Sequence, residues 1–597
     1  MSVPDVPARV PNYIEHTFLA WAYDGEAEDG RAWRALERVA AHYARLSAEP
    51  LERHASFGAR TGLALLVRRD ERRRWPLWSE GERSALAWTT APTGWGAVVG
   101  ELDLNAAPAE LASRLAAEPD LIARLNPPLL VGTREEASEE LWIANDFVGA
   151  ARLYEFAAQG VRVWSNRLGA PAVFAGVEPA LDVRAWSVLA ATGWILGAST
   201  AIAGASKVPS ASSLRVRPGP GGTEVLRARS REALELVAPR QASLERSADE
   251  AAAAALGLAR DLRANWDGAL AIDLSGGRDS RISAAGAVAT GIDGPFQTVD
   301  LEPGEVDVVR ELLEKAPRPL EHVVRAAESP TEDDALADRV ADYHLVHDGM
   351  LNPHSVVRGP LPVPQAGVLP PIVSGHGGEL GHGFYYGSKG KLSRAEDMDT
   401  PRLVTKLERA SRRKRDAARE EGYAAFREEA TVALEAGRAL GLEGASLLDH
   451  YYLTQRLAFR SGLGARNDRA SACSTPAFVR ACFDLDPPGR LEGRLHPMLV
   501  ERLVPEWSGV RIFESETAGP VTRSRLYEQP ARREELEALI AAPEEWDDVF
   551  DPDRVRELWE RSREGGGRPH DERILTRIAW RAGFTAHLRT LAAAAGG

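Results

Sequence analysis

The sequence predicts an α/β protein with an α+β portion: a β-containing N-terminal domain, then a doubly wound parallel sheet with a helical extension. Two observations predict this class. Before residue 200, short runs bounded by turn residues are typical of strands, namely Thr61–Val67, Gly96–Leu102 and Gly160–Ser165. After about Ser243, apolar runs alternate with amphipathic stretches, which indicates a parallel sheet covered by helices.

The elements of the second part follow from this alternation. Helices are expected at 245–265, 281–290 and 306–315. Strands are expected at 269–274, 295–299, 320–324 and 369–373. The stretch 395–470 and the tail from 525 have helical spacing. Because glycine and proline interrupt the pattern near residue 220, we expect domains over 1–225 and 246–597 and a linker over 226–245.

Composition excludes several classes of function. The net charge is −14 and the sequence pI is about 5.6, which argues against nucleic acid or an anionic membrane surface as the main partner. Two cysteines, Cys473 and Cys482, rule out a disulfide framework and a cysteine-built zinc site. A histidine-built zinc site is disfavoured because no His-Glu-x-x-His motif occurs. No run is long and apolar enough for a membrane span, and the start lacks a signal-peptide pattern, so we expect a cytoplasmic protein.

The most informative segment is Asp273-Leu-Ser275-Gly276-Gly277-Arg278-Asp279-Ser280. A strand, a glycine turn and a helix in this order direct backbone N–H groups at an anion, and glycines let phosphate oxygens approach. Ser275 and Ser280 add hydroxyl donors, and Asp279 is suited to hold a Mg²⁺ ion that bridges phosphates. The segment is not a Walker loop, because the Gly-Lys-Ser/Thr ending is absent. The alternative is a plain serine-capped turn.

Ser275-Gly-Gly-x-Asp-Ser280 resembles the pyrophosphate loop of the N-type ATP pyrophosphatases, and the asparagine-synthetase branch of that family fits best. Four further segments support the resemblance: Trp164–Ala170 with Ala191–Thr200, like the end of a glutaminase domain; Thr298-Val299-Asp300 with Gly304-Glu305, like the adenine-side strand; Ser374-Gly375-His376-Gly-Gly-Glu379, like the second loop of the branch; and Arg456–Pro476, like its helical substrate wall.

The resemblance implies ATP and Mg²⁺ as cofactors and adenylation of a substrate carboxylate. It assigns ATP or its pyrophosphate to Ser275, Gly276, Gly277, Asp279, Ser280, Val299, Asp300, Ser374 and Gly375, and the metal to Asp279 and Glu379. Glutamine-dependent members expose a cysteine after Met1, where this chain has Ser2. Serine is a poorer nucleophile without an activating base. We therefore expect a degenerate glutaminase-like (Ntn-type) β-sandwich domain that makes no ammonia, with a residual Ser2 amidohydrolase as the alternative.

Two further departures concern catalysis. The third position of the second loop is Glu in asparagine synthetases and Tyr in β-lactam synthetases, whereas here it is His376. An imidazole can accept a proton from an amine near neutral pH, although a turn histidine is the alternative. The late lysine of the family has no counterpart, because no lysine follows residue 414. Arg511 is the candidate replacement, with Arg523 and Arg525 as alternatives, and a surface arginine is an equal alternative.

Four residues near the second loop are candidates for a substrate pocket: Asn352, His354, His382 and Tyr385. An ordinary helix end accounts equally well for Asn352 and His354, and aromatic residues after the loop could instead fill the core.

Together these features favour a lasso-peptide cyclase, a macrolactam synthetase that adenylates an Asp or Glu side chain of a core peptide and joins it to the peptide's N-terminal amine. Its partners would be a ribosomal precursor peptide and, in addition, a leader-binding protein and a leader peptidase. The alternative is a β-lactam-synthetase-like or ammonia-dependent asparagine synthetase that acts on a small amino acid. A nucleotide-binding scaffold without chemistry is a third hypothesis, which the two expected Mg²⁺ ligands, Asp279 and Glu379, oppose.

Overall fold

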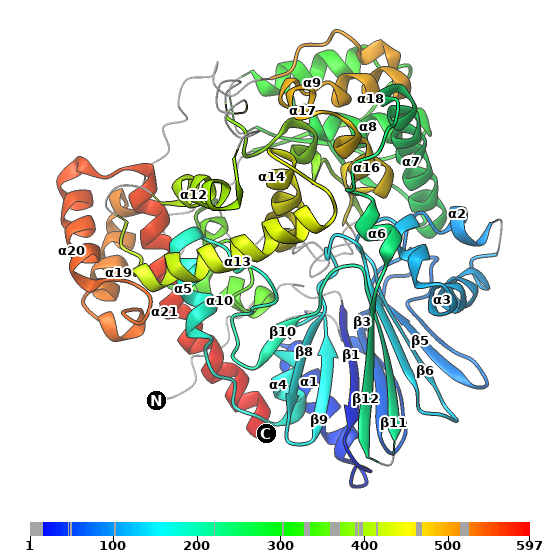
Figure 1. Ribbon diagram of the computed structural model, residues 1–597, viewed down its shortest axis with the longest axis vertical. Coiled ribbons are helices and arrows are strands. Elements are labelled where there is room, and N and C mark those ends of the chain that lie inside the picture. The colour runs from blue at the N-terminus through cyan, green and yellow to red at the C-terminus, as the bar shows by residue number, and fades with distance from the viewer. Residues whose placement is uncertain are drawn as a thin grey trace.

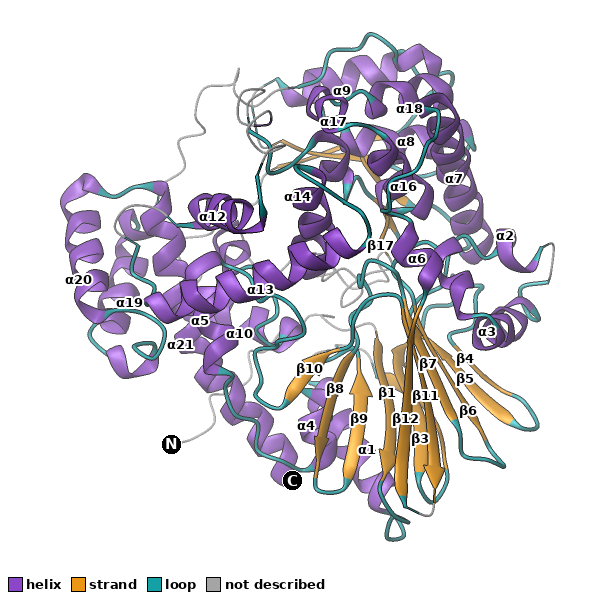
Figure 2. Ribbon diagram, in the orientation of Figure 1, coloured by secondary structure: helices purple, strands orange, loops and turns teal. Residues whose placement is uncertain are grey.

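The computed structural model describes residues 16–45, 47, 50–100, 103–219, 221–300, 302, 304–326, 335–358, 371–387, 392, 398–412, 416–460, 469–513 and 525–597. The fold is mixed α/β, with two six-stranded antiparallel sheets in the N-terminal part and a five-stranded parallel sheet after them (Figure 2). The expected antiparallel and parallel parts are therefore both present. Ser2 lies outside the described residues.

The N-terminal sheets pack against each other, and short helices flank them. The first sheet has the order β10 (Ala205–Lys207), β8 (Tyr154–Ala158), β9 (Val161–Ser165), β1 (His16–Tyr23), β3 (Thr61–Arg68), β2 (Leu51–Phe57). The second has the order β12 (Gly222–Arg229), β11 (Ser212–Gly219), β7 (Leu141–Asn145), β6 (Leu130–Glu135), β5 (Ser84–Trp88), β4 (Trp78–Glu80). The helices are α1 (Arg31–Ala44), α2 (Gly96–Val99), α3 (Ala107–Ala117), α4 (Ala170–Ala175) and α5 (Val183–Thr192).

Strand β1 shows why this part is stable, since all eight of its residues are buried. Because side chains alternate along a strand, one set contributes to the cluster between the two sheets and the other set packs under α1 and α4. Phe18 belongs to the first set, and a Cβ placed on Gly132 of the facing sheet would lie 2.8 Å from its ring. Trp21 belongs to the second set, and its ring centroid is 4.8 Å from that of Phe174 in α4.

The parallel sheet has the order β15 (His322–Ala326), β14 (Phe296–Asp300), β13 (Ala271–Asp273), β16 (Ile372–Val373), β17 (Arg469–Ala470). The chain therefore adds strands on one side of β13 and then returns to add β16 and β17 on the other. At such a change of direction, the loops that leave the two neighbouring strands diverge and open a crevice at their carboxyl ends. Here those loops are the two glycine loops singled out in the sequence.

Helices cover this sheet and extend from it (Figure 1). Those near the sheet are α7 (Leu244–Asn265), α8 (Asp279–Ala289), α9 (Glu305–Glu314), α16 (Pro476–Asp484), α17 (Pro487–Glu492) and α18 (Leu495–Leu503). The extension holds α10 (Leu336–His347), α12 (Thr400–Ser411), α13 (Glu420–Ala439), α14 (Ser446–Tyr451), a π-helix (Tyr452–Leu457), α15 (Ala458–Arg460), α19 (Pro530–Ile540), α20 (Pro552–Arg561) and α21 (Pro569–Gly596). Helix α21 packs on α10 and on α1 and α4, so the end of the chain covers the N-terminal part.

Two expectations about local structure need correction. The run Gly96–Leu102 is not a strand, because Gly96–Val99 forms the short helix α2, while residues 101 and 102 lie outside the described part. The segment 226–245 is not a plain linker: β12 continues to Arg229, where it still pairs with Ser212 of β11. Helix α6 (Arg231–Glu235) follows within the same segment. The alternating residues after Gly222 extend the hairpin beyond the glycine-rich turn that suggested a boundary.

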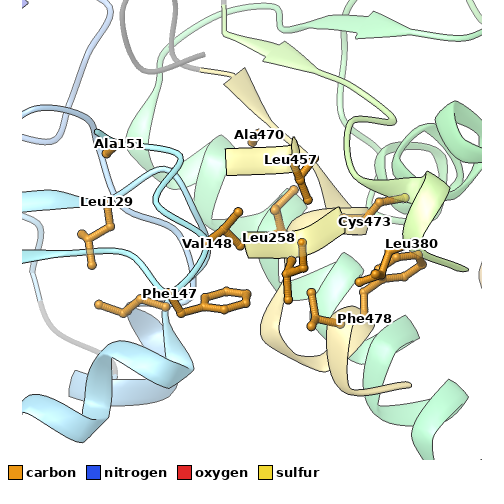
Figure 3. Packing of buried hydrophobic residues seen from close by; sticks show 14 of the residues in the cluster. Leu129, Phe147, Val148, Ala151, Leu258, Leu380, Leu457, Ala470, Cys473 and Phe478 are labelled. Atoms are coloured by element: carbon orange, nitrogen blue, oxygen red, sulfur yellow. The ribbon is translucent and has the colours of Figure 1, made fainter. Parts of the chain in front are cut away.

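The N-terminal and parallel-sheet parts share one hydrophobic cluster rather than meeting at a polar surface. Figure 3 shows Phe147 and Val148 of the β7–β8 loop beside Leu258, Leu457 and Ala470 of the second part. The loop is held in shape by the buried carboxylate of Asp146, which accepts hydrogen bonds from the backbone N–H groups of Leu129 and of residues 148, 149, 150 and 151. Among the helices that the structure describes, none combines the length and apolar character needed to cross a membrane.

A buried ion pair fixes the chain after the second glycine loop. Arg490 of α17 is fully buried and its Nε lies 3.0 Å from Oδ2 of Asp449 in α14. The same Nε donates to the Tyr386 hydroxyl at 2.9 Å, and that hydroxyl donates to Asp449. The terminal guanidinium nitrogens donate to the Ser446 hydroxyl and to two carbonyls at the end of α16.

Removing the Asp449 carboxylate should therefore destabilise the fold. We expect Asp449→Ala to lower the free energy of unfolding by about 3–5 kcal/mol, because a buried guanidinium would lose its counter-charge. Chemical denaturation followed by tryptophan fluorescence measures the effect. The control is Asp267→Ala, which removes an exposed pair with Arg74 and should cost at most about 1 kcal/mol. Equal losses for the two variants would contradict the role of the pair.

Candidate functional site

The first glycine loop joins β13 to α8 and is built as an anion-binding turn. Helix α8 has no side-chain cap at its N-terminus, so its first backbone N–H groups remain available. The Ser280 hydroxyl accepts the Ser275 N–H at 2.9 Å and lies 3.0 Å from the Ser275 hydroxyl, which in turn accepts the Gly277 N–H at 3.2 Å. The two serine side chains thus stabilise the turn that contains Gly276 and Gly277.

The second loop leaves β16 and touches the first one through glycines. A Cβ placed on Gly375 would overlap the Ser280 amide nitrogen, and one placed on Gly378 would lie 2.6 Å from Oδ1 of Asp279. Only residues without a side chain allow this approach. Ser374 precedes the contact; its hydroxyl is buried and has no hydrogen-bond partner within the described ranges. The loops expected to act together are therefore in direct backbone contact.

The Asp279 carboxylate lies between two imidazoles. Nε2 of His496, in α18, is 2.9 Å from Oδ1, and Nε2 of His382 is 3.6 Å from Oδ2. Burial alone would raise the pKa of Asp279, but the two neighbouring histidines outweigh burial and lower that pKa below its usual range. Burial lowers the pKa of His496. Asp279 is therefore ionised at neutral pH and lies beside two imidazole rings.

His496 was not expected from the sequence. It lies more than two hundred residues after Asp279, and its own segment carries no motif. His382 was expected to line a substrate pocket, whereas its nearest charged partner is the carboxylate of the first loop. Gly381, directly before it, packs against the ring of His496, since a Cβ there would lie 2.7 Å from that ring.

A carboxylate from the protein already occupies part of the first loop. The Gly276 N–H donates to Oε1 of Glu305, the first residue of α9, at 3.2 Å. Burial raises the pKa of Glu305, although the bond from Gly276 opposes the shift. Arg281 supplies the nearby positive charge and donates to the carbonyls of Gly276 at 2.8 Å and Val510 at 2.9 Å. The loop is thus lined by charges of both signs.

His376 lies in the second loop, where its backbone contacts the segment before α16. Its carbonyl accepts the Ser474 hydroxyl at 3.0 Å. The residue lines a small cavity together with Pro128 and Val148 of the N-terminal part and with Leu457. Gly377, which follows it with φ +97°, turns the chain so that Gly378 and Glu379 run back toward the first loop. Of the loop histidines, His382 lies beside the Asp279 carboxylate.

Arg511, the expected replacement for the late lysine, contacts the first loop through its backbone and not through its guanidinium. The Arg511 carbonyl accepts a bond from Arg281 at 2.5 Å, so its backbone lies against the first loop. Its side chain is exposed and close enough to Glu311, on α9, to lower the pKa of that carboxyl together with Lys315. Of the alternatives, Arg525 lies 3.6 Å from Glu572 of α21, and Arg523 is outside the described residues. Arg281 is thus the arginine whose guanidinium contacts the loop.

Aromatic rings and one arginine follow the second loop. The Arg456 guanidinium, on the π-helix, lies between the rings of Trp194 and Phe384, 4.1 and 4.0 Å from their centroids. It donates to the Tyr385 hydroxyl at 3.3 Å, and burial raises the pKa of Tyr385. No carboxylate of the described chain pairs with Arg456, and its Nε is buried without a hydrogen-bond partner there. π-Helices frequently occur at functional sites.

The remaining expected residues lie at the edges of the crevice or outside it. Val299 and Asp300 end β14 and are exposed, Val299 by 43%. Asn352 accepts the His354 N–H at 2.9 Å in the turn before a 3₁₀ segment that packs on α21, which is the local role of a helix-end turn. The buried Cys473 thiol lies 3.6 Å from the Asp279 carbonyl, and burial raises its pKa.

The residues present can hold a Mg²⁺ ion only if phosphate oxygens supply part of the coordination shell of the ion. Within the described ranges, no group of three or more His, Cys, Asp or Glu side chains could hold a metal ion. Asp279 offers ionised oxygens, and Glu379 follows Gly378, which touches that carboxylate. Mg²⁺ typically takes one or two protein carboxylates and completes its shell with water and phosphate oxygens. The donor set matches this pattern and not that of a protein-only metal site.

Comparison with known proteins adds little. No family model matches the chain, and no curated protein matches it. Two similar solved structures are one titled as the allosteric regulatory enzyme of purine biosynthesis and a glutamine phosphoribosylpyrophosphate amidotransferase from B. subtilis complexed with ADP and GMP. Identities are 10% and 11%, covering 53% and 54% of this chain and 82% and 83% of theirs, each with a TM-score of 0.21. At this TM-score the likeness bears on neither fold nor function.

The geometry predicts that Glu305 competes with a bound anion. We expect Glu305→Gln to bind inorganic pyrophosphate at least about fivefold more tightly in the absence of metal, since two like charges about 4 Å apart interact by about 1 kcal/mol even in water. Isothermal titration calorimetry with pyrophosphate measures the change. Glu314→Gln, at the other end of α9, is the control and should leave affinity unaltered. Equal affinities for wild type and Glu305→Gln would refute the competition.

Proposed function

We propose that this chain is an ATP-dependent, AMP-forming enzyme that makes an amide bond. The observation that carries the proposal is the contact of two glycine loops, from neighbouring parallel strands, at the uncapped N-terminus of α8. This arrangement offers backbone N–H groups and serine hydroxyls to an anion, with an ionised Asp279 beside them. A triphosphate with its metal ion fits this site, because the phosphates accept from the N–H and hydroxyl groups and the metal ion pairs with the Asp279 carboxylate.

In the proposed reaction, a substrate carboxylate oxygen attacks the α-phosphorus of ATP, and pyrophosphate leaves. An amine then attacks the acyl carbon, and AMP leaves as the new C–N bond forms. Ser275, Gly277 and Ser280 would bind the departing pyrophosphate, and the orphaned Ser374 hydroxyl would donate to it as well. Asp279 and Glu379 would hold Mg²⁺, which neutralises charge on the phosphates.

The attacking amine has to lose a proton. His376 is the residue proposed from the sequence to accept it, and it lies at the boundary between the two parts of the molecule. Holding amine and acyl group together would supply much of the rate, since well-oriented intramolecular reactions gain about 7–11 kcal/mol. Arg281, whose guanidinium donates to the Gly276 carbonyl, would offset charge that develops there.

The residues beyond the second loop favour a peptide over a free amino acid. Phe384 is 36% exposed, and Trp194 is partly buried, so aromatic surface faces the substrate side. Arg456 lies between them, and none of the carboxylates in the described ranges pairs with it. We therefore propose a lasso-peptide cyclase, in which a core peptide with an Asp or Glu side chain is joined to its own N-terminal amine. A small-molecule amide synthetase is the second candidate, because a lone arginine also suits an amino-acid carboxylate.

The proposal predicts pyrophosphate release that depends on substrate. With ATP, Mg²⁺ and a linear peptide carrying a free N-terminal Gly and an Asp or Glu several residues on, we expect pyrophosphate release and loss of one water from the peptide. Asp279→Asn should lower kcat/KM at least about a hundredfold, because the metal-binding charge is lost while the side-chain volume is kept. A pyrophosphate assay and mass spectrometry provide the two readouts.

The controls separate the candidates. Turnover only with free aspartate and ammonia would replace the cyclase by the small-molecule synthetase. Asp553→Asn, an exposed carboxylate on α20, controls for the substitution itself. The proposed function would be contradicted if the wild type neither bound nor cleaved ATP with all these substrates present.

Arg456 is expected to bind substrate rather than ATP. Arg456→Met should raise the KM for the accepted carboxylate substrate about tenfold or more and leave the KM for ATP within about twofold, since a charge-assisted hydrogen bond is worth about 1.5–3 kcal/mol. Steady-state kinetics with each substrate varied in turn measure this split. Arg563→Met, which removes an exposed pair with Glu537, is the control. A parallel rise in both KM values would instead indicate loss of structure.

A further inference from the structure

A second cavity, of about 480 Å³, lies away from the glycine loops. Its walls come from the loops after β7 and around β10 of the N-terminal part, from α6, and from α13 and the helices after it. The walls are mainly apolar: Phe147, Val208, Val237, Ala433, Leu440 and Leu453. Cavities that hold small molecules typically measure about 300–1,000 Å³ and have such linings.

The cavity opens to solvent along α13. Val432 lines it and is 67% exposed, and Ala436 and Ala439, one and two turns further along the helix, line it and are exposed too. At the inner side, Val148 separates this cavity from the small one that His376 lines. The cavity is thus reachable from outside without passing through the glycine-loop crevice.

The few charged groups in the wall are mostly cations. Arg152, Lys207 and Arg229 line the cavity, and Glu429 is the one acidic residue among the described residues that line it. Glu429 lies 3.7 Å from Arg184, whose positive charge partly neutralises it. His450 also lines the cavity and is neutral at pH 7, because burial lowers its pKa to about 4. The wall therefore carries an excess of positive charge.

Lys207 is the cation without a partner. Its ammonium makes no hydrogen bond and no ion pair with any residue in the described ranges, whereas Arg152 donates to the carbonyls of Met350 and Phe459. Burial, followed by the nearby charge of Arg152, lowers the pKa of Lys207 to about 8, so the side chain is still largely protonated at pH 7. An unpaired ammonium in an apolar wall is a strong site for an anion.

We propose that this cavity binds a small monocarboxylate with an unbranched apolar chain. The carboxylate would pair with Lys207, and the chain would lie along the apolar wall toward α13. The apolar surface selects the body of the ligand and the uncompensated charge selects its head group. This assignment does not rest on the proposed ligase activity, because it uses different residues and a different opening.

Isothermal titration calorimetry with sodium octanoate tests the proposal on the full chain. We expect one site per chain, and decanoate should bind about 15-fold more tightly than octanoate, at about fourfold per methylene. Lys207→Met should weaken octanoate binding about tenfold or more but leave 1-octanol binding unaltered. Ala436→Trp, at the mouth of the cavity, should abolish binding of both.

Two matched variants control for the substitutions. Lys315→Met removes an exposed lysine on α9, and Thr431→Trp adds a ring on α13 at a position that does not line the cavity; neither should alter octanoate affinity. Octanoate binding that survives both Lys207→Met and Ala436→Trp would overturn the assignment. So would the absence of saturable binding to the wild type, or saturation by a trileucine peptide with a free carboxyl end and not by octanoate.

Discussion

The approach of two backbones at the start of α8 is the constraint on which the site depends. Gly375 meets the Ser280 amide and Gly378 meets the Asp279 side chain, and neither position leaves room for a Cβ. The contact exists because β13 and β16 are parallel neighbours, so the loops that leave them start at the same edge of the sheet. The strands are short, with three residues in β13 and two in β16. The contact brings His382 and Glu379, which follow from the second loop, close to Asp279 of the first.

Groups of both signs line the crevice before any ligand enters. Asp279 and Glu305 bring two carboxylates to a turn whose free N–H groups attract anions, Arg281 supplies a cation, and two imidazole rings lie beside Asp279. Bare phosphate would add negative charge to this set, whereas phosphate accompanied by a divalent cation would not. The arrangement therefore discriminates by charge as well as by shape. In a chain of net charge −14, this local compensation matters more than the overall field.

The local sequence pattern predicted most elements of the parallel sheet. Contacts between segments that are distant along the chain could not be predicted from it. The helix expected at 245–265 is Leu244–Asn265, because periodicity over this length reflects burial directly. The strand expected at 295–299 is Phe296–Asp300, and it was identified by its place in an alternating series of strands and helices. The run 96–102 was mistaken for a strand, because a short apolar run does not contain enough residues for its period to distinguish a helix from a strand.

In the site, the two loops were predictable since each is a contiguous motif. His496 and the contact of Glu305 with Gly276 were not, because each depends on a tertiary contact between distant segments. The distinct positions of His376 and His382 depend on glycines with positive φ at 377 and 383, which sequence spacing does not reveal.

The N-terminal part is needed for the site whether or not it has chemistry of its own. Asp146 gathers five backbone N–H groups and so fixes the loop that carries Phe147 and Val148. Val148 then lies in the wall of both cavities, with Leu457 on one side and Ala458 on the other. These two residues are consecutive at the end of the π-helix that positions Arg456. Removal of the N-terminal part would expose the shared apolar cluster and take away the packing that supports the helix with the arginine.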